Sequence, residues 1–166
     1  MTYLITFHTY GTWLHGHDKG SVDNEHNQID TPRLPPSPPR MSNERALMKN
    51  RAIKLNPEHR FVVDATIREV CNYPKWKLHA LSVRSTHVHV VVSAKHAPER
   101  VMSDLKAYCT RRMREARVLD AATEPWSHHG STRYVDTDNS FARAKAYVND
   151  EQGEPLEMTP PLGWKR

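Results

Sequence analysis

The sequence predicts an α+β fold in which helices cover one face of an antiparallel sheet. Short runs of β-branched and aromatic residues alternate with helical patterns along the chain. Two of these runs, 76–83 and 87–94, are separated by a short turn at Arg84-Ser85, which indicates a hairpin. The full order is strand, helices, strand, strand, helix, strand, helix. This is the ferredoxin-like βαββαβ order followed by an extra C-terminal helix, and it leaves the other face of the sheet open.

The opening segment, Tyr3 to Leu14, is rich in aromatic and β-branched residues and predicts the first strand. The next segment, 15–40, contains five prolines between Pro32 and Pro39. No packed element suits that composition, so we expect a long loop with extended, polyproline-like character. A loop of this length inside one domain is a candidate lid, binding arm or disordered insertion.

Capping residues predict two helices before the hairpin. Ser42 is a candidate N-cap for a helix that runs to about Leu55. Asn56 followed by Pro57 combines an N-cap with the residue favoured at the first helical position. We therefore expect a second helix that ends near residues 73–74.

The C-terminal half predicts a helix, a strand and a helix. The helix over 98–117 carries one apolar stripe formed by Met102, Leu105, Cys109 and Met113. Residues 132–136 predict a short strand, and Asp138 is a candidate cap for a helix over 139–152, closed by Gly153. The sequence therefore predicts one domain over 1–153 and an irregular tail over 154–166.

Composition limits the class of protein. The formal net charge is +5 and the isoelectric point is near 9.3, which favours an anionic partner, nucleic acid first. A mean hydropathy of −0.76 and the lack of a long apolar run argue against a membrane protein. The N-terminus carries no basic segment typical of a secretory signal. Because the only cysteines are Cys71 and Cys109, a reduced, cytoplasmic protein is expected.

The predicted strand THVHVVV contains the strongest candidates for functional side chains. Residues two apart on a strand share a face, so His87 and His89 point one way, while Val88, Val90 and Val92 point the other way into the core. Two adjacent imidazoles can hold a divalent cation, each through one ring nitrogen. The alternative is a pair of histidines on a half-exposed strand with no ligand.

The HVHVVV segment resembles the His-hydrophobic-His motif of single-tyrosine transposases, which include those of insertion sequences and of repetitive extragenic palindromes. The resemblance extends to the opening YLITFHTYGTWLHG, to HHGSTRYV and to the last helix, AKAYVNDEQG. It implies a ferredoxin-like sheet with the motif on a central strand. It also implies that Tyr147 is the nucleophile, and that a polar side chain about one turn later is the third metal ligand.

Two residues compete for that third ligand. At about 100° per residue, Glu151 falls about 40° from Tyr147 on a regular helix, whereas Gln152 falls about 140° away. Helix geometry therefore favours Glu151, and the side-chain chemistry implied by the resemblance favours Gln152. Because Gly153 follows at once, the last turn can unwind and bring Gln152 round, so both residues remain candidates.

Two tyrosines can be compared as nucleophiles. Tyr147 lies beside the apolar stripe of its helix, where boundary tyrosines are common, and only the resemblance makes it the candidate. Tyr108 is the rival, but it shares a stripe with Val101 and Leu105 and is expected to flank the core.

The resemblance implies a mechanism. Mg²⁺ or Mn²⁺, bound by imidazole and oxygen ligands, would polarise a phosphoryl oxygen. Tyr147 would attack the phosphorus and form a 5′-phosphotyrosine, releasing a 3′-hydroxyl. The substrate class is single-stranded DNA that contains hairpins, and the activity is endonucleolytic cleavage followed by rejoining, the strand transfer of DNA transposition and recombination. The resemblance leaves open a homodimer in which Tyr147 serves a partner's site.

Basic and aromatic side chains are candidates for DNA contacts. Arg133, Arg143 and Lys145 lie nearest the expected site, and Lys106 and Arg111 belong to the long helix with Arg112, Arg114 and Arg117. The alternative for the long helix is a solvated face held by ion pairs. The candidates for base stacking are Trp13, Trp76, Trp126 and Tyr134, although most such aromatics are simply core.

A protein that keeps the scaffold but only binds nucleic acid is the main alternative function. Loss of covalent DNA adducts in Tyr147→Phe, with binding retained, would separate the two. A histidine-triad hydrolase is a third hypothesis, but it requires a further histidine where this chain has Val91.

Overall fold

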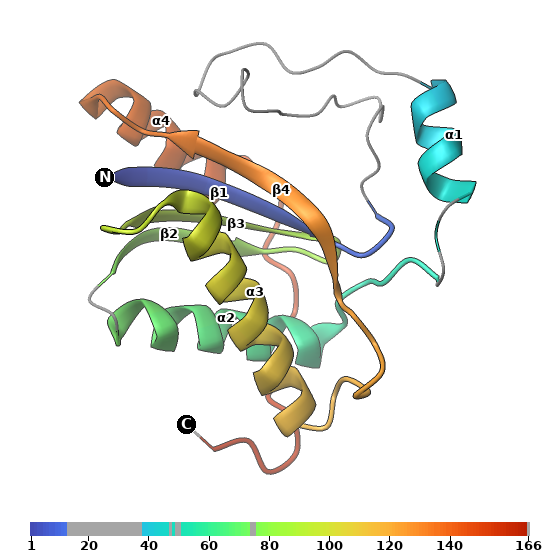
Figure 1. Cartoon of the computed structure of the whole chain (residues 1–166). Coiled ribbons are helices and arrows are strands. Elements are labelled where there is room, and N and C mark those ends of the chain that lie inside the picture. Colours follow the sequence, from blue (N-terminus) through green and yellow to red (C-terminus); the bar gives the residue numbers. More distant parts are fainter. Residues whose placement is uncertain (13–37, 47, 49–50, 74–75, 166) are drawn as a thin grey trace.

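The computed structural model describes residues 1–12, 38–46, 48, 51–73 and 76–165 (Figure 1). The elements in chain order are β1 (Thr2–Thr9), α1 (Pro38–Ala46), α2 (Pro57–Asn72), β2 (Lys77–Val83), β3 (His87–Ser93), α3 (Pro98–Glu115), β4 (Trp126–Tyr134) and α4 (Asp138–Asn149). The strands form one antiparallel sheet in the order β2-β3-β1-β4. This order confirms the α+β, ferredoxin-like prediction, including the extra C-terminal helix.

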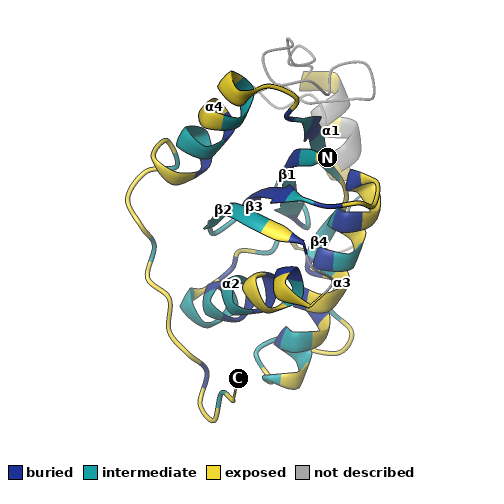
Figure 2. Cartoon of the chain, turned by 90° about the vertical axis from the view of Figure 1, so that its left-hand side faces the viewer, coloured by how far each residue is buried: buried dark blue, intermediate teal, exposed yellow. Residues whose placement is uncertain are grey.

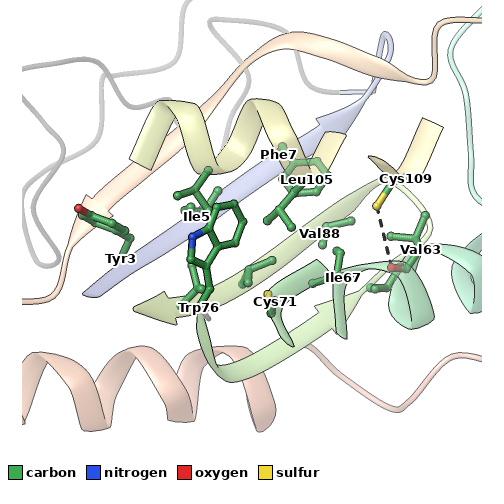
Figure 3. Packing of buried hydrophobic residues seen from close by; sticks show 14 of the residues in the cluster. Tyr3, Ile5, Phe7, Val63, Ile67, Cys71, Trp76, Val88, Leu105 and Cys109 are labelled. Atoms are coloured by element: carbon green, nitrogen blue, oxygen red, sulfur yellow. Dashed lines mark hydrogen bonds between the residues drawn. The ribbon is translucent and has the colours of Figure 1, made fainter. Parts of the chain in front are cut away.

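The larger core lies between the sheet and helices α2 and α3 (Figure 3). Ile5 and Phe7 of β1 and Val88 of β3 point into it, where they meet Ile67 of α2 and Leu105 of α3. The alternation is the two-residue period of a strand, which sends every second side chain to the same face. This core fixes the register of β1 against β3, and it thereby places the residues on their other face.

The second face of the sheet is not open as the sequence predicted, because α4 packs on it (Figure 2). Leu4 and Val91 are buried on this side together with Ala144 and Val148 of α4. An amphipathic helix must bury its apolar stripe, and the stripe of α4 packs against these apolar side chains of the sheet. The central strand β3 is therefore covered on both sides.

Caps define where α2 and α4 begin. Asn56 caps α2 as expected, since its side chain accepts a hydrogen bond from the His59 amide while the His59 ring accepts one from the Asn56 amide. At α4 the prediction was off by one residue: Thr137, not Asp138, is the N-cap. Thr137 is extended and its hydroxyl accepts from the Ser140 amide, whereas Asp138 is already helical.

The first helix differs most from expectation. It spans Pro38–Ala46 instead of 42–55, so Ser42 lies inside it and residues 38–40 of the expected loop are helical. Prolines are tolerated in a first turn because the amides there have no intrahelical partner. Residues 51–56 are not helical, since the Ile53 amide donates to the Tyr10 carbonyl and the Leu55 amide to that of Ser85. Loop residues 15–37 lie outside the described residues.

Other element ends also move. β1 stops at Thr9 where the prediction extended to residue 14, and 10–12 form a turn. β4 begins at Trp126 and ends at Tyr134 where 132–136 were expected, because it pairs with β1 along most of its length. The long helix stops at Glu115, since Arg117 adopts a left-handed φ of 58°. None of the helices in the described ranges combines the length and apolar character that crossing a membrane requires.

Candidate functional site

Strand β3 places His87 and His89 on the face covered by α4. Their ring centroids lie 4.7 Å apart, and the ring of Tyr147 on α4 lies 5.1 Å from that of His89. His89 is 4% exposed, whereas His87 and Tyr147 are half-buried. The two predicted imidazoles and the predicted phenol are therefore brought together from two elements that are distant in sequence.

Two threonines hold the imidazoles. The Thr6 hydroxyl lies 2.7 Å from Nδ1 of His89, and the Thr86 hydroxyl lies 3.0 Å from Nδ1 of His87. Both distances are those of hydrogen bonds. Each ring is thus bonded through the same nitrogen, which leaves Nε2 on the opposite side of the ring.

Strand β1 contributes residues that the sequence reasoning missed. The register pairs Thr6 with His89 and His8 with His87, and the rings of His8 and His87 lie 5.6 Å apart. Directly opposed residues in an antiparallel pair project from the same face. The signal was present in the alternation of β1, where Ile5 and Phe7 face the core and Thr6 and His8 must face the other way.

Helix α4 makes a second ring contact with the sheet. Phe141 near the start of α4 lies edge-on against His79 of β2, with centroids 4.8 Å apart, and Nε2 of His79 lies 2.7 Å from the Ser93 hydroxyl. Burial lowers the pKa of His79, and the positive charges of Lys77 and Lys145 lower it further. These causes all favour a neutral His79 beneath α4.

The structure separates the two candidates for a third ligand. Because α4 ends at Asn149, the regular-helix geometry that favoured Glu151 does not extend to that residue. Glu151 is exposed, whereas Gln152 is half-buried and its Nε2 donates to the Tyr147 carbonyl over 2.7 Å. The amide oxygen of Gln152, the atom that could bind a cation, takes no part in that bond.

The donor set suits a divalent cation only in part. Two imidazole nitrogens and an amide oxygen are ligands that Mn²⁺ or Mg²⁺ accepts. Across the described ranges, however, no three His, Cys, Asp or Glu side chains gather into a group that could hold a metal ion. A site here would therefore use His87, His89 and an oxygen from Gln152 or from the substrate.

Tyr108, the rival nucleophile, lies in the other layer. It is 39% exposed on α3, which packs on the face opposite to the two imidazoles, and Arg111 lies 4.6 Å above its ring. The expectation that it would flank the core is not met, because Val101 and Leu105 are buried and Tyr108 is not.

The basic residues fall into two groups. Arg133 pairs with Leu4 across the sheet and so projects on the α4 face, where Arg143 and Lys145 belong to α4 itself. Lys106 and Arg111 are on α3, in the opposite layer. Arg133, which is buried, and the two α4 cations thus belong to the layer that contains the imidazoles, whereas the predicted α3 cations belong to the opposite layer.

The two α3 cations are engaged within the protein. The ammonium of Lys106 donates to the carbonyls of Ser127, His128 and His129 at 2.9–3.3 Å, and burial lowers the pKa of Lys106 to about 8. Arg111 lies 3.9 Å from Glu115. These contacts fit the alternative of a helix face held by internal interactions.

Three of the four aromatic candidates have structural contacts. Trp76 is buried in the larger core, Trp126 donates from its ring to the Lys106 carbonyl over 3.1 Å, and Tyr134 lies edge-on against Tyr3. Trp13 lies outside the described residues.

The chain was compared with known protein families, and one family model matches it. The sequence model of the family described as "Transposase IS200 like" matches residues 46–151. No curated protein matches the chain.

Two of the solved structures that are similar to the chain are transposases or transposase candidates. One is a REP-associated tyrosine transposase bound to a REP hairpin, with 11% identity, a TM-score of 0.46 and coverage of 89% of this chain and 63% of that one. The other is a transposase candidate from Deinococcus radiodurans R1, with 12% identity, a TM-score of 0.44 and coverage of 93% and 92%. The chain thus spans less than two thirds of the length of the first.

Proposed function

The chain belongs to the IS200-like transposase family, and from this premise we propose that it cleaves and rejoins single-stranded DNA through a covalent tyrosine intermediate. The observation that supports this chemistry is the contact between Tyr147 and His89, whose rings lie 5.1 Å apart. A nucleophile and a charge-stabilising group must both reach one phosphorus atom, and side chains that are already neighbours can do so without rearrangement.

The proposed reaction conserves the number of phosphoester bonds. The phenol oxygen of Tyr147 attacks the phosphorus of a phosphodiester, and the bond from phosphorus to the 3′ oxygen breaks. The phenol loses its proton and the leaving 3′ oxygen gains one to become a hydroxyl, while the phosphate keeps its ester bond to the 5′ oxygen and gains a new one to Tyr147. Attack by a 3′-hydroxyl on that phosphotyrosine then rejoins a strand and returns the phenol.

A divalent cation, Mg²⁺ or Mn²⁺, is part of this proposal. His87 and His89 would hold it through ring nitrogens, together with the amide oxygen of Gln152. When bound, such a cation supplies Lewis acidity that offsets the charge developing on the phosphoryl oxygens. The protein's own residues orient the nucleophile: Ala144 and Val148 fix α4 on the sheet, and the ring of Tyr147 rests on His89.

Positive charge on the same face supports DNA as the partner. Arg133 projects from the sheet on the side that α4 covers, and Arg143 and Lys145 belong to α4, so all three come from the layer that contains the imidazoles. Phosphate contacts by such cations would position a strand without reading its sequence. We propose single-stranded DNA with hairpins as the substrate class. Tyr147 lies against His89 of the same chain, so one chain holds both the nucleophile and the imidazoles. A homodimer in which Tyr147 serves the partner's site stays a prediction.

The test is a covalent adduct assay with labelled hairpin-containing single strands and Mn²⁺, read on a denaturing gel. The wild type should give a band shifted by the mass of the protein. Tyr147→Phe and His89→Ala should lose the band, and Tyr147→Phe should still bind the DNA in a native gel.

Tyr108→Phe is the matched control, because it removes the same hydroxyl from the opposite layer. It should keep the adduct. An adduct that survives in Tyr147→Phe and disappears in Tyr108→Phe would refute the assignment of the nucleophile. DNA binding with no adduct in any variant would favour the alternative of a non-catalytic nucleic-acid-binding protein.

A further inference from the structure

We propose that the hydroxyls of Thr6 and Thr86 are positioning groups that hold His89 and His87 in the same tautomer, with the proton on Nδ1. Nε2 of each ring is then the atom able to bind a divalent cation. The inference rests on the proposed function for the presence of a cation. It adds two residues from separate parts of the chain, whose role is to set the tautomer of the imidazoles.

The geometry is the same at both histidines. Thr6 on β1 lies 2.7 Å from Nδ1 of His89, its cross-strand partner, and Thr86 precedes β3 and lies 3.0 Å from Nδ1 of its neighbour His87. Threonine is branched at Cβ, so its side chain has few rotamers to choose from, especially in a strand, where Thr6 lies. A hydroxyl held in this way is a fixed partner for a ring nitrogen rather than a mobile one.

The direction of these bonds decides what the rings can do. A neutral imidazole has one nitrogen that donates and one that accepts. If each threonine oxygen accepts from Nδ1–H, Nε2 carries the lone pair that a cation needs. If instead each hydroxyl donates to Nδ1, Nε2 carries the proton and cannot be a ligand. The proposed function requires the first arrangement.

The tautomer can be measured without metal or DNA. Long-range ¹H–¹⁵N correlation spectra of the labelled wild-type protein, at about pH 8 where free imidazoles are neutral, should show the proton on Nδ1 of both rings. Comparison with His87→Gln and His89→Gln assigns the two signals. A proton on Nε2 of either ring would overturn the inference.

Metal affinity gives the second readout. Removing an outer partner of a ligating histidine typically costs about ten- to a hundredfold in metal affinity. We expect Thr6→Val and Thr86→Val each to weaken Mn²⁺ binding, measured by electron paramagnetic resonance, within that range. Thr6→Ser and Thr86→Ser keep the hydroxyl and should restore binding.

Thr2→Val is the matched control. Thr2 is on the same strand and face as Thr6, but its hydroxyl bonds to Ser93 over 2.8 Å, four residues away from the histidine contact. It should leave Mn²⁺ affinity unchanged.

The two proposals fail differently. Normal Mn²⁺ binding in Thr6→Val and Thr86→Val would overturn the positioning role and leave the proposed function intact. Protons on Nδ1 of both rings in a protein that binds no Mn²⁺ would support the positioning role and remove the cation from the proposed function.

Discussion

Cys71 of α2 and Cys109 of α3 lie in the core that these helices form against the sheet (Figure 3). Both are free thiols, 1% and 0% exposed, and Sγ of Cys109 lies 4.0 Å from the Val63 carbonyl. Burial raises the pKa of Cys71 to about 11 and raises that of Cys109 as well. Buried thiols of this kind behave as small apolar side chains.

The raised pKa of Cys71 predicts a loss of stability in alkali. Above the ordinary thiol pKa the unfolded chain loses the Cys71 proton while the folded chain keeps it, so the free energy of unfolding falls as pH rises from about 9 to about 11. The slope from this group approaches about 1.4 kcal/mol per pH unit. Urea denaturation at several pH values measures it.

Cys71→Ala is the control for the alkaline transition. It introduces a cavity that lowers stability at every pH, but it removes the group that titrates. Its free energy of unfolding should therefore fall less steeply over this pH range than that of the wild type. Parallel curves for the two proteins would show that Cys71 is not desolvated.

Helix α4 is the element on which the proposed chemistry depends. Its buried residues are only Ala144 and Val148, with Phe141 and Tyr147 packed partly against the sheet. With so small an apolar contact, the N-terminal cap matters more than it would in α2 or α3. The position of Tyr147 therefore depends on Thr137, ten residues away.

Removal of this cap should loosen α4 specifically. Thr137→Ala takes away the hydroxyl that accepts from the Ser140 amide over 3.1 Å, at a cost of about 1 kcal/mol. We expect the amides of α4 to exchange with solvent about fivefold faster, since about 1.4 kcal/mol corresponds to a factor of ten. Native-state hydrogen exchange measures the change element by element.

Thr137→Ser keeps the hydroxyl and should restore the wild-type exchange rates in α4. The amides of α2, which has its own cap at Asn56, should respond to neither substitution. Equal acceleration in α2 and α4 would mean that α4 does not open on its own, and that the cap contributes only to global stability.

Over the whole molecule, the tail joins the two faces of the sheet. It leaves α4, and the Glu154 carbonyl accepts from Arg84 over 2.8 Å. The tail then reaches α2, where the Glu157 carbonyl accepts two bonds from Arg60 and the Thr159 amide donates to the Pro57 carbonyl. Further on, Trp164 lies edge-on against Phe61.

Arg60 donates two of the hydrogen bonds that hold this tail. Its side chain is 8% exposed and donates to the carbonyls of Leu55 and Glu157. Arg60→Met keeps the length of the side chain but leaves these carbonyls without their donor, which should lower the free energy of unfolding by about 2–4 kcal/mol. Chemical denaturation measures the loss, and a glutamate-specific protease should cleave faster at Glu157.

Arg68→Met, on the same helix, is the matched control. Arg68 pairs with Asp64 on the surface and its side chain is 57% exposed, so its loss should change stability by no more than about 0.5 kcal/mol. Similar effects at the two positions would show that the tail contacts of Arg60 contribute no stability.

Local chemistry made the element types, most of the element order and the pairing of His87 with His89 predictable. Alternation in β3 determines which side chains share a face, and an N-cap followed by proline determines where α2 begins. The ends of the elements were less predictable, because the end of α4 and the start of β4 depend on tertiary contacts. The prolines at 38 and 39 were expected to belong to a loop, but they form the first turn of α1.

Strand and helix periodicity act over a few residues, so the pattern of residues was enough to predict the ferredoxin-like order and the two imidazoles on one face. The choice of Tyr147 as the phenol came from the family resemblance. The three-dimensional packing was needed to show that α4 lies over the imidazoles, that Tyr108 lies in the other layer, and that Thr6 is hydrogen-bonded to His89. Those relations join residues far apart in the chain. They are set by strand register and by burial of the apolar face of α4, which no local pattern records.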